Sequence, residues 1–214
     1  MDAPFDLQQT DKLLSTTRAV RKRLDFSKPV EREVLLDCIR LSQQAPTGSN
    51  TQMWRWVIVT DTEKRRALSE IYGRGVEFLN EAKSGVAEGD DQTRRVYDSA
   101  DYLVEHMHEV PALVIPCVVG RPPEGSPNVV TASIFGSILP AVWSFQLALR
   151  SRGLGSAYTT LHLAWEDEVA ALLNIPSDVM QVALLPVAYT LGLDFKVAQR
   201  QPPEEIVHWD SWQQ

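Results

Sequence analysis

The sequence predicts a mixed α+β sandwich formed by a single domain over residues 1–214. Segments with helical spacing alternate with short apolar, β-branched runs, and several of the gaps between them are hairpin-like. That order favours an α+β sandwich over a strict array of parallel βαβ units. With 214 residues and 44% hydrophobic side chains, the chain is long enough for one large core and short for two.

The first half is expected to be mostly helical, with one strand. Apolar residues recur with helical spacing after an acidic first turn at Glu31, and Pro46 and Gly48 end that helix. Residues 81–95 are the most polar part of the chain and indicate a mobile connection or a lid. The expected elements are a helix at 6–15, a helix at 31–44, a strand at 54–60, a helix from Asp61 or Thr62 to about Asn80 and a helix at 96–108.

The second half contains the most apolar segments. A helix at 131–150 is so apolar that it needs burial on several sides, which a subunit interface could supply. The C-terminal arm at 195–214 cannot be a compact helix, and its Trp209 and Trp212 are expected to pack on something, such as another subunit. The other expected elements are a strand at 110–119, a Pro/Gly loop at 120–127, a short strand at 153–159, a helix at 166–173 and a core strand at 181–192.

Composition argues against several classes of protein. A net charge of −7 argues against a nucleic-acid binder. No uninterrupted apolar stretch reaches the roughly 18 residues of a membrane span, and the polar N-terminus lacks a signal peptide. We therefore expect a cytoplasmic protein with no membrane partner. Cys38 and Cys117 lie in apolar runs and are expected to be reduced core thiols.

Motifs for metal, nucleophilic or dinucleotide chemistry are missing from the sequence. His106 and His108 lie two residues apart, which places them on different helix faces, and no HExxH or Cys/His cluster occurs. There is no GxSxG motif, and acidic pairs such as Asp90-Asp91 lie in polar, solvated segments. Gly153-Leu154-Gly155 lacks the third glycine of a dinucleotide fingerprint and follows a helix, so we interpret both glycines as a helix stop.

Basic residues are the remaining candidates. Arg18 and Arg21 lie in a basic cluster within an acidic protein, which is either a solvated loop or an anion site. Charge alone favours the solvated loop, and the basis of the alternative is that planar guanidinium groups bind phosphate through two parallel hydrogen bonds. Arg200 lies beside two prolines, and alone it is weak evidence.

Four segments, in this order, resemble the nitroreductase family of flavin-dependent oxidoreductases. The segments are Arg18-Ala19-Val20-Arg21, Ala45-Pro46-Thr47-Gly48-Ser49-Asn50-Thr51-Gln52-Met53-Trp54, Gly153-Leu154-Gly155 and Arg200-Gln201-Pro202. The resemblance spans nearly the whole chain. Ala19 and Thr47 replace serines of the family pattern, and Met53 replaces a proline.

The resemblance implies a three-layer sandwich: a central, mostly antiparallel mixed sheet flanked by helices, with a C-terminal arm that reaches a partner subunit. It also implies a homodimer with FMN at the interface, Arg18 and Arg200 on the FMN phosphate, and Ala19 in the phosphate site without the usual hydroxyl. Arg21 would reach the ribityl chain or the N1–C2=O edge of the ring. The remaining implied contacts are Pro46, Thr47, Gly48 and Asn50 from the other subunit, Gln52 as a brace for their loop, and Thr159, Thr160 and Leu161 at the ring edge that carries N5.

The implied activity is an FMN-dependent oxidoreductase. A hydride would pass from NADH or NADPH through flavin N5 to a small acceptor such as a nitroaromatic, a quinone or an enone, by a ping-pong mechanism without a catalytic side chain or a metal. Two alternatives remain: a flavin-dependent dehalogenase or flavin-fragmenting relative, with the variable 81–109 region as a lid over the substrate, and a flavin-binding protein without turnover.

Overall fold

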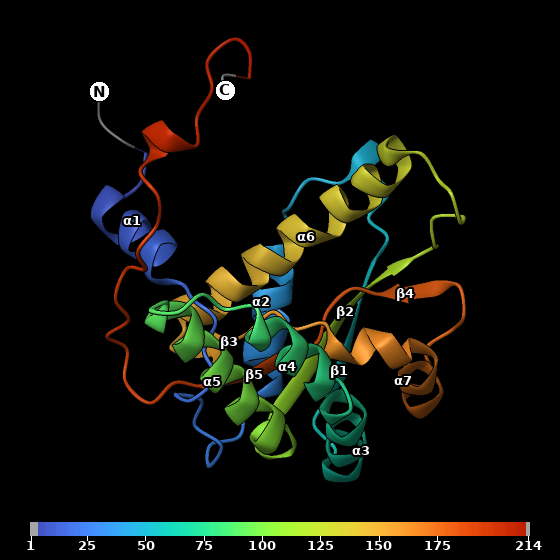
Figure 1. Cartoon of the computed structure of the whole chain (residues 1–214). Helices are drawn as coiled ribbons and strands as arrows, with labels where there is room; N and C mark the ends of the chain where they lie inside the picture. The colour runs from blue at the N-terminus through green and yellow to red at the C-terminus, as the bar shows by residue number, and fades with distance from the viewer. Residues whose placement is uncertain (1–3, 213–214) are drawn as a thin grey trace.

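The computed structural model describes residues 4–212 and has an α+β architecture (Figure 1). The helices are α1 (Leu7–Thr16), α2 (Arg32–Ser42), α3 (Thr62–Gly73), α4 (Val76–Ser84), α5 (Asp91–His106), α6 (Asn128–Ser151) and α7 (Glu166–Leu173). The strands are β1 (Trp54–Val59), β2 (Ala112–Val119), β3 (Leu154–Ser156), β4 (Val179–Gln181) and β5 (Leu185–Tyr189). Single 3₁₀ turns are η1 (Gly48–Asn50), η2 (Met107–Glu109), η3 (Leu161–Trp165) and η4 (Pro203–Glu205).

The five strands form one sheet in the order β1-β2-β5-β3, with β4 also paired to β2. All four strand pairs are antiparallel, and one isolated parallel bridge joins Ala19 to Ser156. Central strand β2 is buried on both faces, which explains its uninterrupted apolar sequence. The predicted α+β sandwich, with a mostly antiparallel sheet, is confirmed.

Alternation along β2 produces the three layers. Val114 and Val118 pack in one apolar cluster with α2 and α6, whereas Ile115 and Cys117 pack in a second cluster with α3, α5 and α7. Because successive side chains of a strand point to opposite faces, one apolar strand contributes to both cores. Cys38 and Cys117 are buried free thiols, and burial raises the pKa of each, to about 11 and about 12 respectively.

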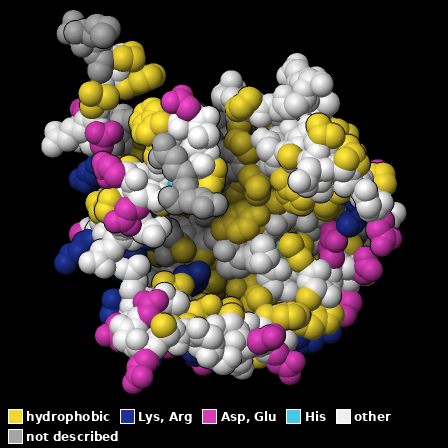
Figure 2. Space-filling view, turned by 45° about the horizontal axis from the view of Figure 1, so that its top comes forward, with side chains coloured by type: hydrophobic (Ala, Val, Ile, Leu, Met, Phe, Trp, Pro, Cys, Tyr) yellow, Lys and Arg dark blue, Asp and Glu magenta, His cyan; other side chains and the backbone are white. Residues whose placement is uncertain are grey.

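Helix α6 crosses one face of the sheet. Among the described residues it is the one helix long and apolar enough to cross a membrane by length and composition, a feature that the sequence expectation missed. Its buried residues Val142, Phe145 and Leu149 pack against the sheet, as in the core helix of a globular domain. Val129 and Trp143 of α6 are exposed by 74% and 45%. Hydrophobic side chains gather in a hollow on the face drawn in Figure 2.

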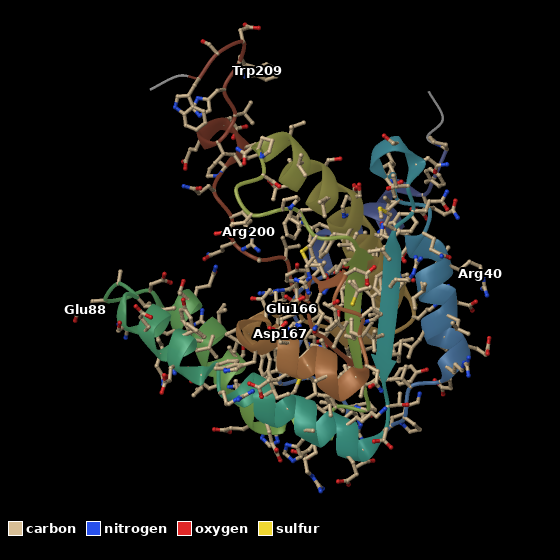
Figure 3. All side chains as sticks on the ribbon, turned by 90° about the vertical axis from the view of Figure 1, so that its right-hand side faces the viewer. Arg40, Glu88, Glu166, Asp167, Arg200 and Trp209 are labelled. Atoms are coloured by element: carbon tan, nitrogen blue, oxygen red, sulfur yellow. The ribbon has the colours of Figure 1, made fainter. Side chains whose placement is uncertain are left out.

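Several predicted boundaries were wrong. The helix expected to reach Asn80 ends at Gly73, and α4 starts at Val76; between them the chain passes so close to Leu161 that a Cβ on Gly75 would lie 2.7 Å from Leu161 Cβ. The polar 81–95 stretch is mostly helical, since α4 continues to Ser84 and the Asp90 side chain caps α5. Figure 3 shows the resulting α4–α5 hairpin projecting from the molecule, with Glu88 at its tip.

The last core strand is also divided. Residues 182–184 lie between β4 and β5: Val182 N–H still donates to the Pro116 carbonyl of β2 at 3.0 Å, whereas Leu184 pairs with Thr159. The strand expected at 153–159 is correspondingly shorter, because only β3 (Leu154–Ser156) pairs with β5.

The C-terminal arm has no helix beyond the single turn η4 within the described residues, as predicted. Its start is fixed by Phe195, whose ring lies 4.2 Å from the Arg23 guanidinium carbon and 4.7 Å from that of Arg150. Beyond this point Trp209 and Trp212 are exposed by 75% and 82%. Trp212 stacks on His208, with ring centroids 4.2 Å apart, but within residues 4–212 neither tryptophan is buried.

Candidate functional site

The Arg18–Arg21 segment is held against β3. Val20 N–H donates to the Ser156 carbonyl at 2.8 Å, next to the Ala19–Ser156 bridge. Gly155 permits this contact, because a Cβ there would lie 2.7 Å from Thr190 Cγ2 and 2.9 Å from Val20 Cβ. Gly153, at φ +77°, does end α6, but the interpretation of Gly155 as a second helix stop was wrong.

A cavity of about 950 Å³ opens beside this segment. Its walls are the 14–21 segment, one face of α5, Trp143 of α6 and arm residues 196–200. Five cationic side chains line it, and no acidic residue of the described chain does: Arg18, Arg21, Arg95, Lys196 and Arg200. None of the five forms an ion pair within residues 4–212. This donor set suits a phosphate or carboxylate.

Arg21 is the most enclosed of these cations. Its Nη1 donates to Ser99 Oγ at 3.1 Å, but its buried Nε has no partner within the described residues. Burial lowers the pKa of Arg21, and the nearby Tyr72 phenol opposes that effect. A buried N–H without an acceptor is costly, so an acceptor on a bound ligand would offset the cost. The orphaned Nε and the unpaired cations together fit the phosphate and carbonyl groups of FMN.

Loop 46–52 adopts a strained backbone on α6. Ser49, Asn50 and Gln52 have φ of 51°, 53° and 50°, the left-handed region that favours glycine. The loop is held by Gly48 N–H, which donates to Ser137 Oγ at 2.9 Å, and by Gln52 Nε2, which donates to Asn50 Oδ1 at 3.0 Å. Pro46 and Asn50 are exposed. Backbone strain of this kind is concentrated at functional sites.

The loop and the cation-lined cavity are separate within one chain. Thr47 is half-buried, and the loop residues after it line a smaller cavity of about 270 Å³ that reaches Ser133 and Ser137, near the start of α6. The cation-lined cavity meets α6 only at Trp143, and the two cavities share no lining residue. The structure thus brings together Arg18, Ala19, Arg21 and Arg200, and places the loop at the other end of α6 (Figure 1).

The Thr159–Leu161 segment is anchored to Leu184, the residue that directly precedes β5. Thr159 N–H and Oγ1 both donate to the Leu184 carbonyl, at 3.2 and 2.6 Å, and its carbonyl accepts from Leu184 N–H at 2.8 Å. Thr159 is thus fixed by its pairing with Leu184 and is buried, whereas Thr160 is exposed, and all three residues of the segment remain predicted contacts of the ring. Burial raises the pKa of the Tyr72 phenol, and the neighbouring Thr159 and Arg21 oppose that rise.

The sequence reasoning missed Arg95, Lys196 and Gln92, which line the same cavity. Gln92, Arg95, Val96 and Ser99 have the i, i+3, i+4, i+7 spacing of one helix face. The signal was hidden because the helix was expected to start at residue 96, whereas α5 starts at Asp91.

A second charged cluster has a different character. Arg121 donates from Nη1 and Nη2 to the two carboxylate oxygens of Glu166 at 2.9 and 2.7 Å, and also to the carbonyls of Ser177 and Val179. Glu166 Oε1 accepts from Gln181 N–H at 2.8 Å. Burial acts to raise the pKa of Glu166, but the hydrogen bonds from Arg121 and Gln181 hold it below its usual value. In the described part of the chain, no group of three or more His, Cys, Asp or Glu side chains could hold a metal.

The fold and the site together define an α+β protein with an antiparallel sheet between helical layers and a cation-lined cavity. Residues 14–189 match the Nitroreductase family, and the chain belongs to that family.

Named relatives include iodotyrosine deiodinases. The Danio rerio enzyme is 28% identical over 184 residues, which cover 83% of this chain and 58% of that protein. The Thermotoga neapolitana enzyme is 27% identical over 178 residues, covering 82% of this chain and 86% of that protein. The chain therefore spans under two-thirds of the fish enzyme's length and most of the bacterial one's.

Solved structures share the fold. Oxidized iodotyrosine deiodinase bound to FMN and 3-iodo-L-tyrosine has a TM-score of 0.70 and 23% identity, with 94% of this chain and 99% of the other covered. The FMN-dependent nitroreductase NfnB of Mycobacterium smegmatis, in complex with NADPH, has a TM-score of 0.67 and 18% identity, with 96% and 100% covered.

Proposed function

We propose that this chain is a cytoplasmic FMN-dependent oxidoreductase that takes electrons from NADH or NADPH and passes them to a small acceptor. The observation that carries the proposal is the cavity with five unpaired cations and the orphaned Arg21 Nε, beside the Arg-x-x-Arg segment of the family. The FMN and NADPH complexes of its structural neighbours support the choice of cofactor and reductant.

Each part of the cavity has a proposed role toward FMN. Arg18 and Arg200, with Lys196 beside them, hold the phosphate. Ala19 stands where the family pattern has a serine, so the phosphate site lacks that serine's hydroxyl. Arg21 donates to the polar edge of the ring, where a cation favours negative charge. Thr159, Thr160 and Leu161 would face the opposite edge. When bound, FMN supplies hydride transfer, so the protein must bind, orient and exclude water rather than provide an acid or base.

We propose that Pro46, Thr47, Gly48 and Asn50 reach the FMN of a second subunit, with Gln52 bracing their loop. The loop and the cavity lie at different ends of α6, so a single chain does not unite them. Exposed apolar residues on α6 and the arm, among them Val129, Leu139 and Trp209, supply surface for a homodimer. Light scattering should give a mass near 48 kDa, twice the 24.0 kDa chain.

The first test is a visible absorption spectrum before and after anaerobic NADH, then NADPH. Flavin bands that bleach support the oxidoreductase and identify the reductant. Bands that persist with both nicotinamides favour a flavin-binding protein without turnover. Absence of flavin after incubation with FMN would refute the proposal.

Removal of a phosphate-binding cation should reduce FMN affinity. We expect Arg18→Ala and Arg200→Ala each to weaken FMN binding by about 10- to 100-fold, because a charge-assisted hydrogen bond is lost. Riboflavin, which has no phosphate, should bind these variants and the unmodified protein alike. Arg94→Ala is the matched control, since Arg94 does not line the cavity. Equal FMN affinity in all four proteins would remove the phosphate role from Arg18 and Arg200.

A second candidate is a flavin-dependent dehalogenase. The α4–α5 hairpin supplies one cavity wall and projects from the molecule, as a lid over a halogenated substrate would. The named relatives make 3-iodo-L-tyrosine the first substrate to assay. Iodide release under anaerobic reducing conditions, with slower proteolysis of residues 85–90 when the ligand is present, would favour this candidate over nitroreduction.

A further inference from the structure

We propose that the second ligand of the cation-lined cavity is an aromatic carboxylate, and that Arg95 of α5 holds its carboxylate. This inference rests on the proposed function, because it names the class of acceptor that shares the cavity with FMN.

One face of α5 turns toward the cavity. Gln92, Arg95, Val96 and Ser99 all line it, and Ser99 is tied to Arg21 by the 3.1 Å hydrogen bond. Arg95 lies one turn before Ser99, about 6 Å along the helix axis at the usual rise per residue. A ligand that lies against the Arg21 end of this face would therefore present its far end to Arg95.

The acids of α5 lie off this face. Asp91, Asp98 and Asp101 do not line the cavity, and Asp101 pairs with Lys83 instead. Arg95 is exposed and forms no ion pair within residues 4–212. Its charge thus remains available to a ligand.

The charge of the cavity exceeds what FMN requires. A phosphate monoester carries a charge of about −1.5 to −2 at neutral pH. Arg18, Arg200 and Lys196 balance that charge, and Arg21 is taken by the ring edge and Ser99, so Arg95 remains as a fifth cation without an assigned anion.

The same wall offers apolar surface. Val96 and Trp143 are exposed by 48% and 45%, and both line the cavity. An aromatic body packed against these side chains, with an anionic group directed at Arg95, matches the mixture of surfaces better than a neutral quinone does.

The test compares two nitroaromatic probes, 4-nitrobenzoate and 4-nitrobenzyl alcohol, by titration calorimetry with the purified holoprotein at low salt. These probes differ mainly in the carboxylate. We expect the benzoate to bind about tenfold more tightly than the alcohol. Arg95→Gln should reduce this ratio to about one while the affinity for the alcohol is kept. Arg94→Gln, which removes the neighbouring charge outside the cavity, should preserve the ratio.

Several results would overturn the inference. One is a ratio of benzoate affinity to alcohol affinity near one in the unmodified protein. Another is a ratio that Arg95→Gln leaves unchanged. A loss in Arg95→Gln confined to FMN relative to riboflavin would assign Arg95 to the phosphate site instead. A loss confined to NADPH relative to NADH would assign it to the reductant.

The calorimetric ratio does not depend on flavin reduction. If the flavin bands bleach but the ratio of benzoate affinity to alcohol affinity is one, the aromatic carboxylate is refuted as the acceptor and the proposed function stands. A high ratio in a holoprotein whose flavin bands persist with both NADH and NADPH refutes the proposed function and leaves the carboxylate site.

Discussion

The two clusters of arginine differ in how their charges are satisfied. Arg121 has both ends of its guanidinium fork on Glu166 and two backbone carbonyls besides. Arg18, Arg95 and Arg200 have no acidic partner within the described chain, although the protein carries seven more acidic than basic side chains. In such a chain, a cavity that excludes carboxylates is a specific arrangement. The paired cluster stabilises the fold, whereas the unpaired cluster is available for a ligand.

Breaking the paired cluster should produce the largest change in stability. Glu166→Ala removes the acceptor of Arg121 and of Gln181 N–H, and Glu166 is only 20% exposed. We expect the free energy of unfolding to fall by about 2–3 kcal/mol, less than for a fully buried pair because Arg121 is 37% exposed. Urea denaturation measures this loss, and FMN affinity should stay within about threefold.

Asp167→Ala is the control for Glu166→Ala. Asp167 is the neighbouring acid, and it forms no ion pair in the described structure. Its removal should cost less than about 0.5 kcal/mol. Equal losses in the two variants would mean that the paired cluster stabilises the fold no more than an unpaired surface charge does.

The layers of this fold were predictable because they depend on local patterns. The alternation of β2 and the apolar stripe of α6 are present in the sequence itself. The breaks were not, because they depend on contacts between distant segments: α3 ends where Gly75 meets Leu161, and β5 begins after Leu184 has paired with Thr159. Gly155 likewise follows a helix in the sequence, and only folding brings Val20 against it.

The cavity could be predicted only in part for the same reason. Arg18, Arg21 and Arg200 belong to motifs that resemble the family, whereas Arg95 and Lys196 join them only through folding. No sequence pattern shows that a cavity lacks acids, since that depends on which faces of α5 and the arm turn inward.

His162 extends the comparison from paired charges to a buried group that stays neutral. It is fully buried, and neither ring nitrogen has a partner within residues 4–212. Burial lowers its pKa to about 4, against a weaker opposing effect of Glu166. Since the unfolded chain protonates near pH 6.5, the protein should lose stability as pH falls from about 6.5 to 4, where only the unfolded state gains the proton.

His162→Leu should remove that dependence. Near pH 7 the substitution should change the free energy of unfolding by less than about 1.5 kcal/mol, because no hydrogen bond is lost. Between pH 7 and pH 5, the free energy of unfolding of the unmodified protein should fall by about 2 kcal/mol more than that of the variant. Parallel urea curves at the two pH values measure it. Curves that shift equally with pH in both proteins would show that His162 ionises freely in the folded state.

An acidic side chain introduced into the cation-lined cavity should change the free energy of unfolding least of all these variants, yet it should clearly lower ligand affinity. Gln92→Glu changes one amide to a carboxylate on the cavity wall, at the second residue of α5. A negative charge near a helix N-terminus is favourable, so stability should hold or rise by up to about 0.5 kcal/mol. Affinity for 4-nitrobenzoate should nevertheless fall by about 3- to 10-fold, because the new carboxylate competes for Arg95. Thr93→Glu introduces the same charge one residue later, outside the cavity lining, and should leave that affinity unchanged. If both variants weakened the benzoate equally, net charge rather than the acid-free lining would control binding, and the distinction between the two arginine clusters would lose its functional meaning.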